Sequence, residues 1–163
     1  MRTLRGAKAR IALLLAVAGA IVVPVLAATG SAAPGRQRIM IDETLRGSNG
    51  VFVLRPLTAG PLEADSGTVV FVGGLTGSGS RNGQEFKRYA GVETFHGKLG
   101  VLRVPNSVVS TDAPHGYTIG VGTWRIRGGA GAYSGVRGGG RQSFVGTADG
   151  ATYTRYEGYV IGG

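Results

Sequence analysis

Short apolar runs, separated by Gly, Asn, Asp and Pro, make up most of the chain after residue 37. β-Branched and aromatic residues fill these runs, and no window shows an apolar stripe with a helical period. Regularly spaced short strands with turn residues between them predict an antiparallel sandwich or barrel. The predicted strands are Arg38–Arg46, Val51–Leu57, Gly67–Leu75, Phe86–Phe95, Leu99–Val104, Val108–Ser110, Tyr117–Arg127, Arg141–Gly146 and Ala151–Ile161.

The alternation of apolar residues along the predicted strand Tyr117–Arg127 favours a barrel over a sandwich. The apolar residues of 117–121 share one strand face, whereas Trp124 and Ile126 fall on the opposite face. A one-residue bulge at Gly120 or Gly122 would restore a common face, and such bulges curl a sheet toward closure. We therefore predict an all-β fold, a single closed antiparallel barrel.

The segment Gly128–Gly140, GGAGAYSGVRGGG, is dense in glycine and lies between two predicted strands. Glycine permits backbone conformations that other residues avoid, so clusters of it mark sharp turns. We expect this segment to be a connection between strands and not a helix.

The first 27 residues have the layout of a secretory signal peptide. Four basic residues precede the uncharged run Ile11–Leu26, and small residues follow. The run is shorter than the ~20 residues of a spanning helix, and Pro24 interrupts it. We expect a signal-peptide helix that is cleaved, a secreted extracellular protein beginning between Ala28 and Pro34, and no stable membrane insertion.

This gives a signal peptide at 1–27, a linker at 28–37 and one barrel domain at 38–163. The chain has 18 Lys and Arg against nine Asp and Glu, and loss of residues 1–27 leaves a net charge of about +5. Positive charge favours anionic partners, but without clustered Lys or Arg we interpret it as a source of solubility and expect no nucleic acid. The chain has no cysteine, so the core must supply the folding energy.

The stretch WRIRGGAGAYSGVRGGG, followed by ATYTRYEGYV, resembles the C-terminal half of the dirigent and allene oxide cyclase-like barrels. Gly128–Gly131 matches the GGTG turn of that family with Ala for Thr, Tyr133 matches its aromatic residue, and Arg137–Gly138 matches its Arg-Gly pair. The resemblance covers 124–160 well, while the N-terminal half aligns only loosely through 38–46.

The resemblance implies an eight-stranded barrel, often in trimers, whose apolar lumen holds a small apolar or amphipathic ligand, with isomerase (cyclase)-like activity. It implies ligand binding by Arg137, with Asp42 as the acidic residue of the first strand. Tyr133 is expected in the pocket wall or, equally, in the packed core, and the alternative for Arg137 is a solvated turn residue. Lignan-forming dirigent proteins carry an Asp directly after the GGTG turn. Ala132 stands there in this chain, which speaks against dirigent-type coupling.

Periodicity predicts a different acidic residue in the interior. Glu43 shares a face with Ile41 and Leu45, and a three-residue turn at Ser48–Gly50 would set it opposite Arg55. A Glu43–Arg55 pair on an apolar face would be a structural ion pair or a ligand anchor. Because adjacent strand residues face apart, Asp42 and Glu43 cannot both point into the lumen.

The sequence gives little support for a metal site or a cofactor site. His96 and His115 are the only histidines and both lie beside turn glycines, so we expect no metal site, and no cofactor motif is complete. The leading interpretation is a secreted barrel that binds a small ligand. The alternative is a non-catalytic cell-envelope binding protein that acts through its basic surface.

Overall fold

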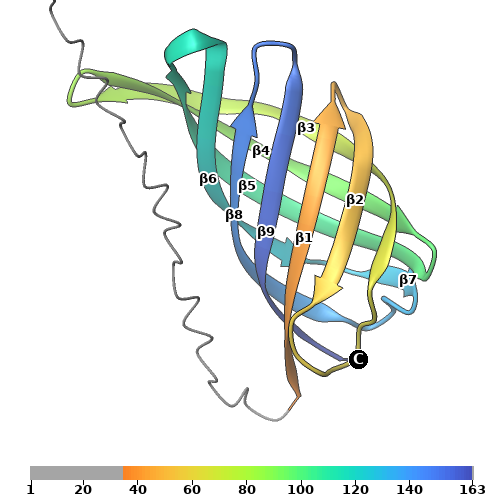
Figure 1. The fold of residues 1–163 in the computed structure, drawn as a ribbon. Coiled ribbons are helices and arrows are strands. Elements are labelled where there is room, and N and C mark those ends of the chain that lie inside the picture. The colour runs from red at the N-terminus through yellow and green to blue at the C-terminus, as the bar shows by residue number, and fades with distance from the viewer. Residues whose placement is uncertain (1–34, 163) are drawn as a thin grey trace, which may run out of the picture. The chain divides into compact units, whose positions relative to one another are not determined.

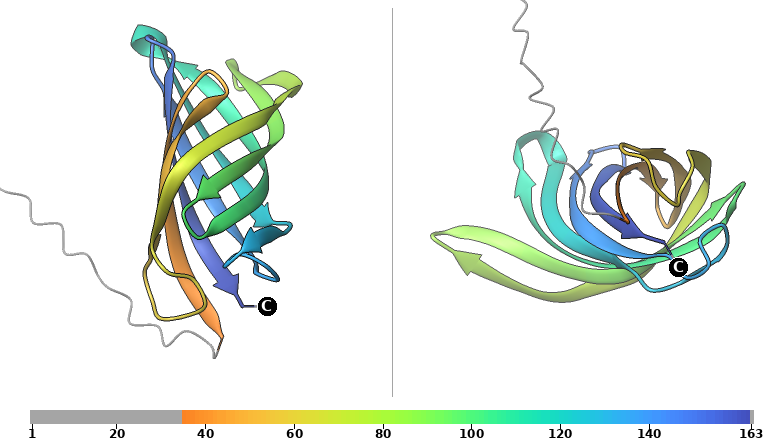
Figure 2. Two further views of the ribbon diagram at one scale, coloured as in Figure 1. Left: turned by 90° about the vertical axis from the view of Figure 1, so that its right-hand side faces the viewer. Right: turned by 90° about the horizontal axis from the view of Figure 1, so that it is seen from below.

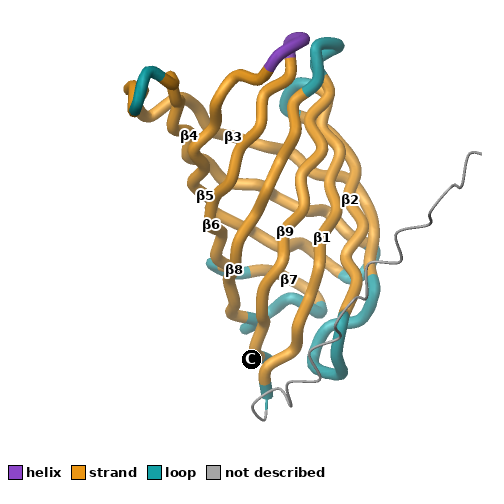
Figure 3. Tube along the Cα trace, turned by 60° about the vertical axis from the view of Figure 1, so that its left-hand side comes forward, coloured by secondary structure: helices purple, strands orange, loops and turns teal. Residues whose placement is uncertain are grey.

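Nine strands account for most of residues 35–162, the part of the chain that the computed structural model describes (Figure 1). They are β1 (Arg36–Arg46), β2 (Asn49–Pro56), β3 (Asp65–Arg81), β4 (Gln84–Gly97), β5 (Gly100–Ala113), β6 (Tyr117–Ile126), β7 (Gly129–Gly131), β8 (Arg137–Gly146) and β9 (Ala151–Ile161). The helical content of these residues is one 3₁₀ turn, Pro114–Gly116, between β5 and β6 (Figure 3). The predicted signal peptide, its cleavage region and most of the predicted linker lie outside the described residues.

The strands form one antiparallel sheet whose pairings close on themselves. The order is β4-β3-β2-β1-β9-β8-β6-β5-β7, and β4 also pairs with β5, so eight strands form a ring to which β7 adds at the start of β5. Figure 2 shows this sheet curling around a common interior. The all-β prediction is confirmed.

The strand boundaries follow the predicted runs to within two residues, apart from three larger differences. β3 continues through the Gly- and Ser-rich residues up to Arg81 and pairs there with the start of β4. The two short runs around Pro105 belong to the single strand β5. Gly128–Gly140 contains no helix, as predicted, but is a connection only in part, because β7 and the first four residues of β8 lie within it.

β1 places alternate side chains inside the ring, from Gln37 to Leu45. Glu43 is among them and is only 3 % exposed, whereas Asp42 lies on the outer face. Periodicity therefore predicted the inward acidic residue correctly, and the placement of Asp42 in the lumen, which came from the resemblance, was wrong.

The predicted pairing of Glu43 with Arg55 was wrong. The β1–β2 connection is a two-residue turn, Gly47-Ser48, in which Gly47 has φ of +62°. Arg46 therefore pairs with Asn49, and Glu43 lies opposite Phe52. Because this turn is one residue shorter than predicted, each side chain of β2 lies on the face opposite to the expected one, and Arg55 points outward.

The predicted bulge in β6 was also wrong. β6 pairs with β5 and β8 in an unbroken register. Its outward residues Tyr117, Ile119 and Val121 are 43 %, 46 % and 66 % exposed, while Trp124 and Ile126 point into the core. Apolar residues thus occupy both faces of β6, and those of the outer face are exposed. The sheet has a shift of register elsewhere, in β3 between Leu75 and Gly77.

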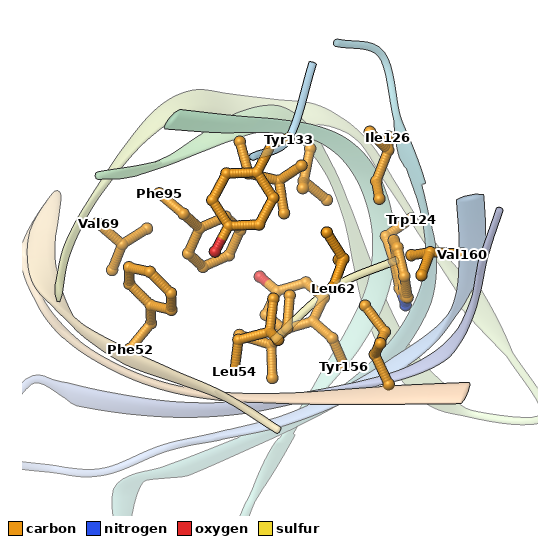
Figure 4. Packing of buried hydrophobic residues seen from close by; sticks show 14 of the residues in the cluster. Phe52, Leu54, Leu62, Val69, Phe95, Trp124, Ile126, Tyr133, Tyr156 and Val160 are labelled. Atoms are coloured by element: carbon orange, nitrogen blue, oxygen red, sulfur yellow. The ribbon is translucent and has the colours of Figure 1, made fainter. Parts of the chain in front are cut away.

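One end of the ring is packed solid. Phe52, Phe95, Tyr156 and Trp124 meet there edge to face, with ring centroids 5.0 to 6.2 Å apart (Figure 4). The β2–β3 loop inserts Leu62 into this core. Gln37 fixes the loop, because its amide oxygen accepts from the Leu62 N–H at 2.8 Å and its nitrogen donates to the Leu62 carbonyl at 2.7 Å.

Candidate functional site

Two buried glutamates face each other inside the ring. Glu43 comes from β1 and Glu93 from β4, strands that are not neighbours, and the two side chains are 3 % and 4 % exposed. The Tyr156 hydroxyl from β9 makes a long hydrogen bond of 3.5 Å to Glu43 Oε2, and the Asn106 amide of β5 donates to Glu93 Oε2. The four side chains form a polar cluster, which we call the carboxyl cluster, inside an otherwise apolar interior.

Burial sets the protonation of this cluster. Desolvation raises the pKa of Glu43 to about 9, with repulsion from Glu93 adding to the shift. Desolvation also raises the pKa of Glu93 to about 7, although the Tyr156 hydroxyl and the Asn106 amide act in the opposite direction. At neutral pH the pair therefore holds at least one proton, and so offers both a hydrogen-bond donor and acceptors.

A cavity of about 390 Å³ lies at the other end of the ring from the solid core. Its mouth is bordered by the β1–β2 and β8–β9 turns, at Gly47, Thr147 and Gly150. Phe71 and Phe144 are among its apolar walls, and Glu93 and Asn106 bring the carboxyl cluster to its surface. The volume is within the range of small-molecule sites, roughly 300–1,000 Å³.

Buried polar atoms around this cavity lack partners. Ser110 Oγ and Gln142 Oε1 line it, and they have no hydrogen-bond partner among the described residues although the side chains are 2 % and 6 % exposed. Glu43 Oε1 is unpartnered in the same way. An unmet buried polar group costs about 1–3 kcal/mol, so a ligand that pairs with these atoms would recover that free energy.

Tyr133 lies in the solid core and not at the cavity. It is 1 % exposed, and its hydroxyl donates to Asp65 Oδ2 at 2.6 Å. Burial opposes the charge of Asp65, but the hydrogen bonds from Tyr133 and from the Ser66, Leu99 and Lys98 amides lower its pKa. The aromatic residue of the glycine-rich segment thus ties the β7–β8 connection to the start of β3.

Asp42 and Arg55 meet each other, but on the outer face. Arg155 Nε donates to Asp42 Oδ1 at 2.8 Å, and the Arg55 guanidinium contacts the other carboxylate oxygen. Partial burial opposes ionisation of Asp42, but the two arginines lower its pKa below the usual value. This ion-pair triad links β1, β2 and β9 outside the cavity.

Arg137 lies at the start of β8, is exposed, and is not among the residues that line the cavity. It belongs to a group of exposed arginines that lie on the outer faces of β1, β5, β6 and β8, and just after the end of β6. Its neighbours across the sheet are Ile161 and then Arg36, and Arg125 lies across from Gly139. We call this group the arginine surface: Arg36, Arg103, Arg125, Arg127, Arg137 and Arg141.

Sequence reasoning found Glu43 but missed Glu93, Asn106, Ser110, Gln142 and Tyr156. Glu93 carried a signal that was available, since it alternates with the buried Phe95 just as Glu43 alternates with Ile41. The polar uncharged residues carried none, because Ser, Asn and Gln occur equally on the outer faces of strands.

Within residues 35–162, no three His, Asp or Glu side chains gather in a way that could hold a metal ion. No helix of this part is long and apolar enough to cross a membrane. Comparison of the chain with family models, with curated proteins and with solved structures finds no match.

Proposed function

We propose that the ring is a barrel of the dirigent and allene oxide cyclase-like kind and that it binds a small amphipathic molecule in the cavity. The observation that carries this proposal is the set of unpartnered buried atoms, Ser110 Oγ, Gln142 Oε1 and Glu43 Oε1, at and beside an apolar cavity. Apolar walls would supply binding energy at ~25 cal/mol per Å² buried, and the polar atoms would fix the orientation.

The chemistry that suits this site is an isomerisation. Such a reaction moves a proton or a bond within one molecule, so atoms and electrons balance without a co-reactant. A carboxyl pair that holds one proton near neutral pH supplies an acid and a base side by side. Glu93 is the catalytic residue of this proposal because it reaches the cavity surface, and Glu43 is a positioning residue.

A matched pair of variants tests whether ligands enter the cavity. Thr152 lines the cavity, whereas the next residue, Tyr153, is 51 % exposed on the outer face. Native mass spectrometry with medium-chain alcohols should show one retained molecule in the wild type and in Tyr153→Trp, but none in Thr152→Trp. Equal retention by all three proteins, or retention by none, contradicts the proposal.

A second candidate function rests on the arginine surface. Its six arginines form no ion pair within the described part of the chain, so their charge is free to attract an anionic polymer. Inorganic polyphosphate should then bind with a steep salt dependence, and Arg125→Ser combined with Arg137→Ser should weaken it. Retained binding by the double variant contradicts this second function.

Secretion and trimer formation also belong to the proposal. N-terminal sequencing of protein from the culture medium should find a start between Ala28 and Pro34, and a first residue Met1 would contradict it. Val109, Ile119 and Val121 lie exposed on the outer faces of β5 and β6, a surface that self-association would bury. Sedimentation measurements check the trimer.

A further inference from the structure

Charge at the cavity restricts which molecules it can hold. Glu93 is the carboxylate on its surface, and none of the residues of 35–162 that line it is Lys, Arg or His. The arginines of the ion-pair triad and of the arginine surface point outward. An anionic ligand would therefore meet a carboxyl group and no compensating cation, which is costly away from water.

The unpartnered atoms point to the same class of ligand. Gln142 Oε1 is an acceptor and Ser110 Oγ both donates and accepts, while Glu43 Oε1 belongs to a carboxyl group that burial keeps protonated at neutral pH. A ligand that pairs with Gln142 Oε1 and with ionised Glu93 must bring hydrogen-bond donors. A primary ammonium group brings three donors and a positive charge, whereas a hydroxyl brings one donor and no charge.

We propose that the cavity selects a primary amine on an apolar body, with the ammonium group at Glu93 and the apolar part against Phe71 and Phe144. This rests on the proposed function, because it names the class of ligand for the same cavity. The ammonium ion would donate to Glu93, Gln142 Oε1 and Ser110 Oγ, which all line the cavity.

Binding of such a cation should release a proton. The titratable groups that face Glu93 are Glu43 from β1 and Tyr156 from β9, and β5 contributes the neutral Asn106. Of these groups the two glutamates share protons near neutral pH, because burial raises the pKa of both. An ammonium ion beside Glu93 favours its ionised form, so the proton that the pair held leaves to solvent.

Three probes of the same length test the proposal by calorimetry at pH 7: hexylamine, 1-hexanol and hexanoate. Hexylamine should bind at least about tenfold more tightly than 1-hexanol, since a charge-assisted hydrogen bond is about twice as strong as a neutral one. Hexanoate should bind more weakly than either. Titrations in two buffers of different ionisation enthalpy should show proton release with hexylamine and none with 1-hexanol.

Glu93→Gln keeps the shape of the side chain and removes its charge. It should abolish the preference for hexylamine over 1-hexanol, because it removes the charge that favours the ammonium ion. The matched control is Glu157→Gln on the exposed outer side of β9, which should retain the full preference.

The outcomes separate this inference from the function on which it rests. If 1-hexanol binds and Thr152→Trp blocks it, but hexylamine has no advantage or Glu93→Gln keeps that advantage, the amine specificity is overturned and the ligand site stands. If hexanoate binds best, the amine specificity is likewise overturned. If no probe binds to the wild type, both the amine specificity and the proposed ligand site are contradicted.

Discussion

At the residue scale, the same side-chain chemistry has opposite consequences in different surroundings. Asp65 is 6 % exposed and yet keeps its charge, because four hydrogen-bond donors surround it. Glu43 is 3 % exposed, has a single long hydrogen bond and an unpartnered oxygen, and its pKa rises. The four donors stabilise the charged form of Asp65, whereas desolvation and repulsion from Glu93 favour the protonated form of Glu43.

Tyr133→Phe tests the structural side of this contrast. The substitution removes a buried hydrogen bond to a charged group, so the free energy of unfolding should fall by about 1–3 kcal/mol. Denaturant unfolding measures the change. Tyr153→Phe is the control, because the side chain of Tyr153 is exposed and should contribute little. Equal stability of wild type and Tyr133→Phe would show that the Asp65 contact contributes nothing.

At the element scale, the pattern of apolar residues predicted nearly every strand but not every strand face. β1 was assigned correctly because three of its five inward positions, Ile39, Ile41 and Leu45, are large apolar residues that keep the alternation of a strand. The face of β2 was inverted, because the sequence RGSNG is compatible with a two-residue or a three-residue turn and the choice shifts the register by one. The carboxyl cluster depended on that register and on long-range pairing, so only its Glu43 was found.

Gly97 shows how closely two elements approach at the solid end. A Cβ atom at Gly97, where β4 ends, would lie 2.0 Å from Asp65 Oδ2 at the start of β3. Gly97→Ala should therefore displace the Asp65 carboxylate and lower the thermal midpoint by several degrees, as loss of about 1–3 kcal/mol would in a domain of this size. Gly74→Ala in the same hairpin has nothing within 4 Å of its Cβ and should unfold close to wild type. A smaller effect at Gly97 than at Gly74 would contradict the contact.

At the scale of the whole molecule, two sets of carboxyl groups give stability an optimum in pH. Glu43 and Glu93 have folded pKa values of about 9 and about 7, above the ordinary value of 4.5. The unfolded chain releases these protons first as pH rises, so stability falls from about pH 5 upward for as long as the fold keeps them. Asp42 and Asp65 have lowered pKa values, so their contribution is lost below about pH 4.

Denaturant unfolding between pH 3 and pH 9 should therefore show a maximum near pH 5. Glu43→Gln should flatten the alkaline side of this profile and stabilise the protein most at pH 8 to 9, because glutamine has no proton to lose. Glu157→Gln should leave the profile unchanged. Stability that increases steadily from pH 5 to pH 8 would contradict the raised pKa values.

The two ends of the ring differ, because side chains fill one end and the cavity opens at the other. The core around Trp124, Tyr156 and Leu62 blocks one end, so whatever enters the cavity must leave through the same mouth between the β1–β2 and β8–β9 turns. If the cavity binds a ligand as proposed, it would admit the terminus of a long molecule and not its middle, because described core residues fill the far end of the ring. The rest of such a molecule would remain in solvent.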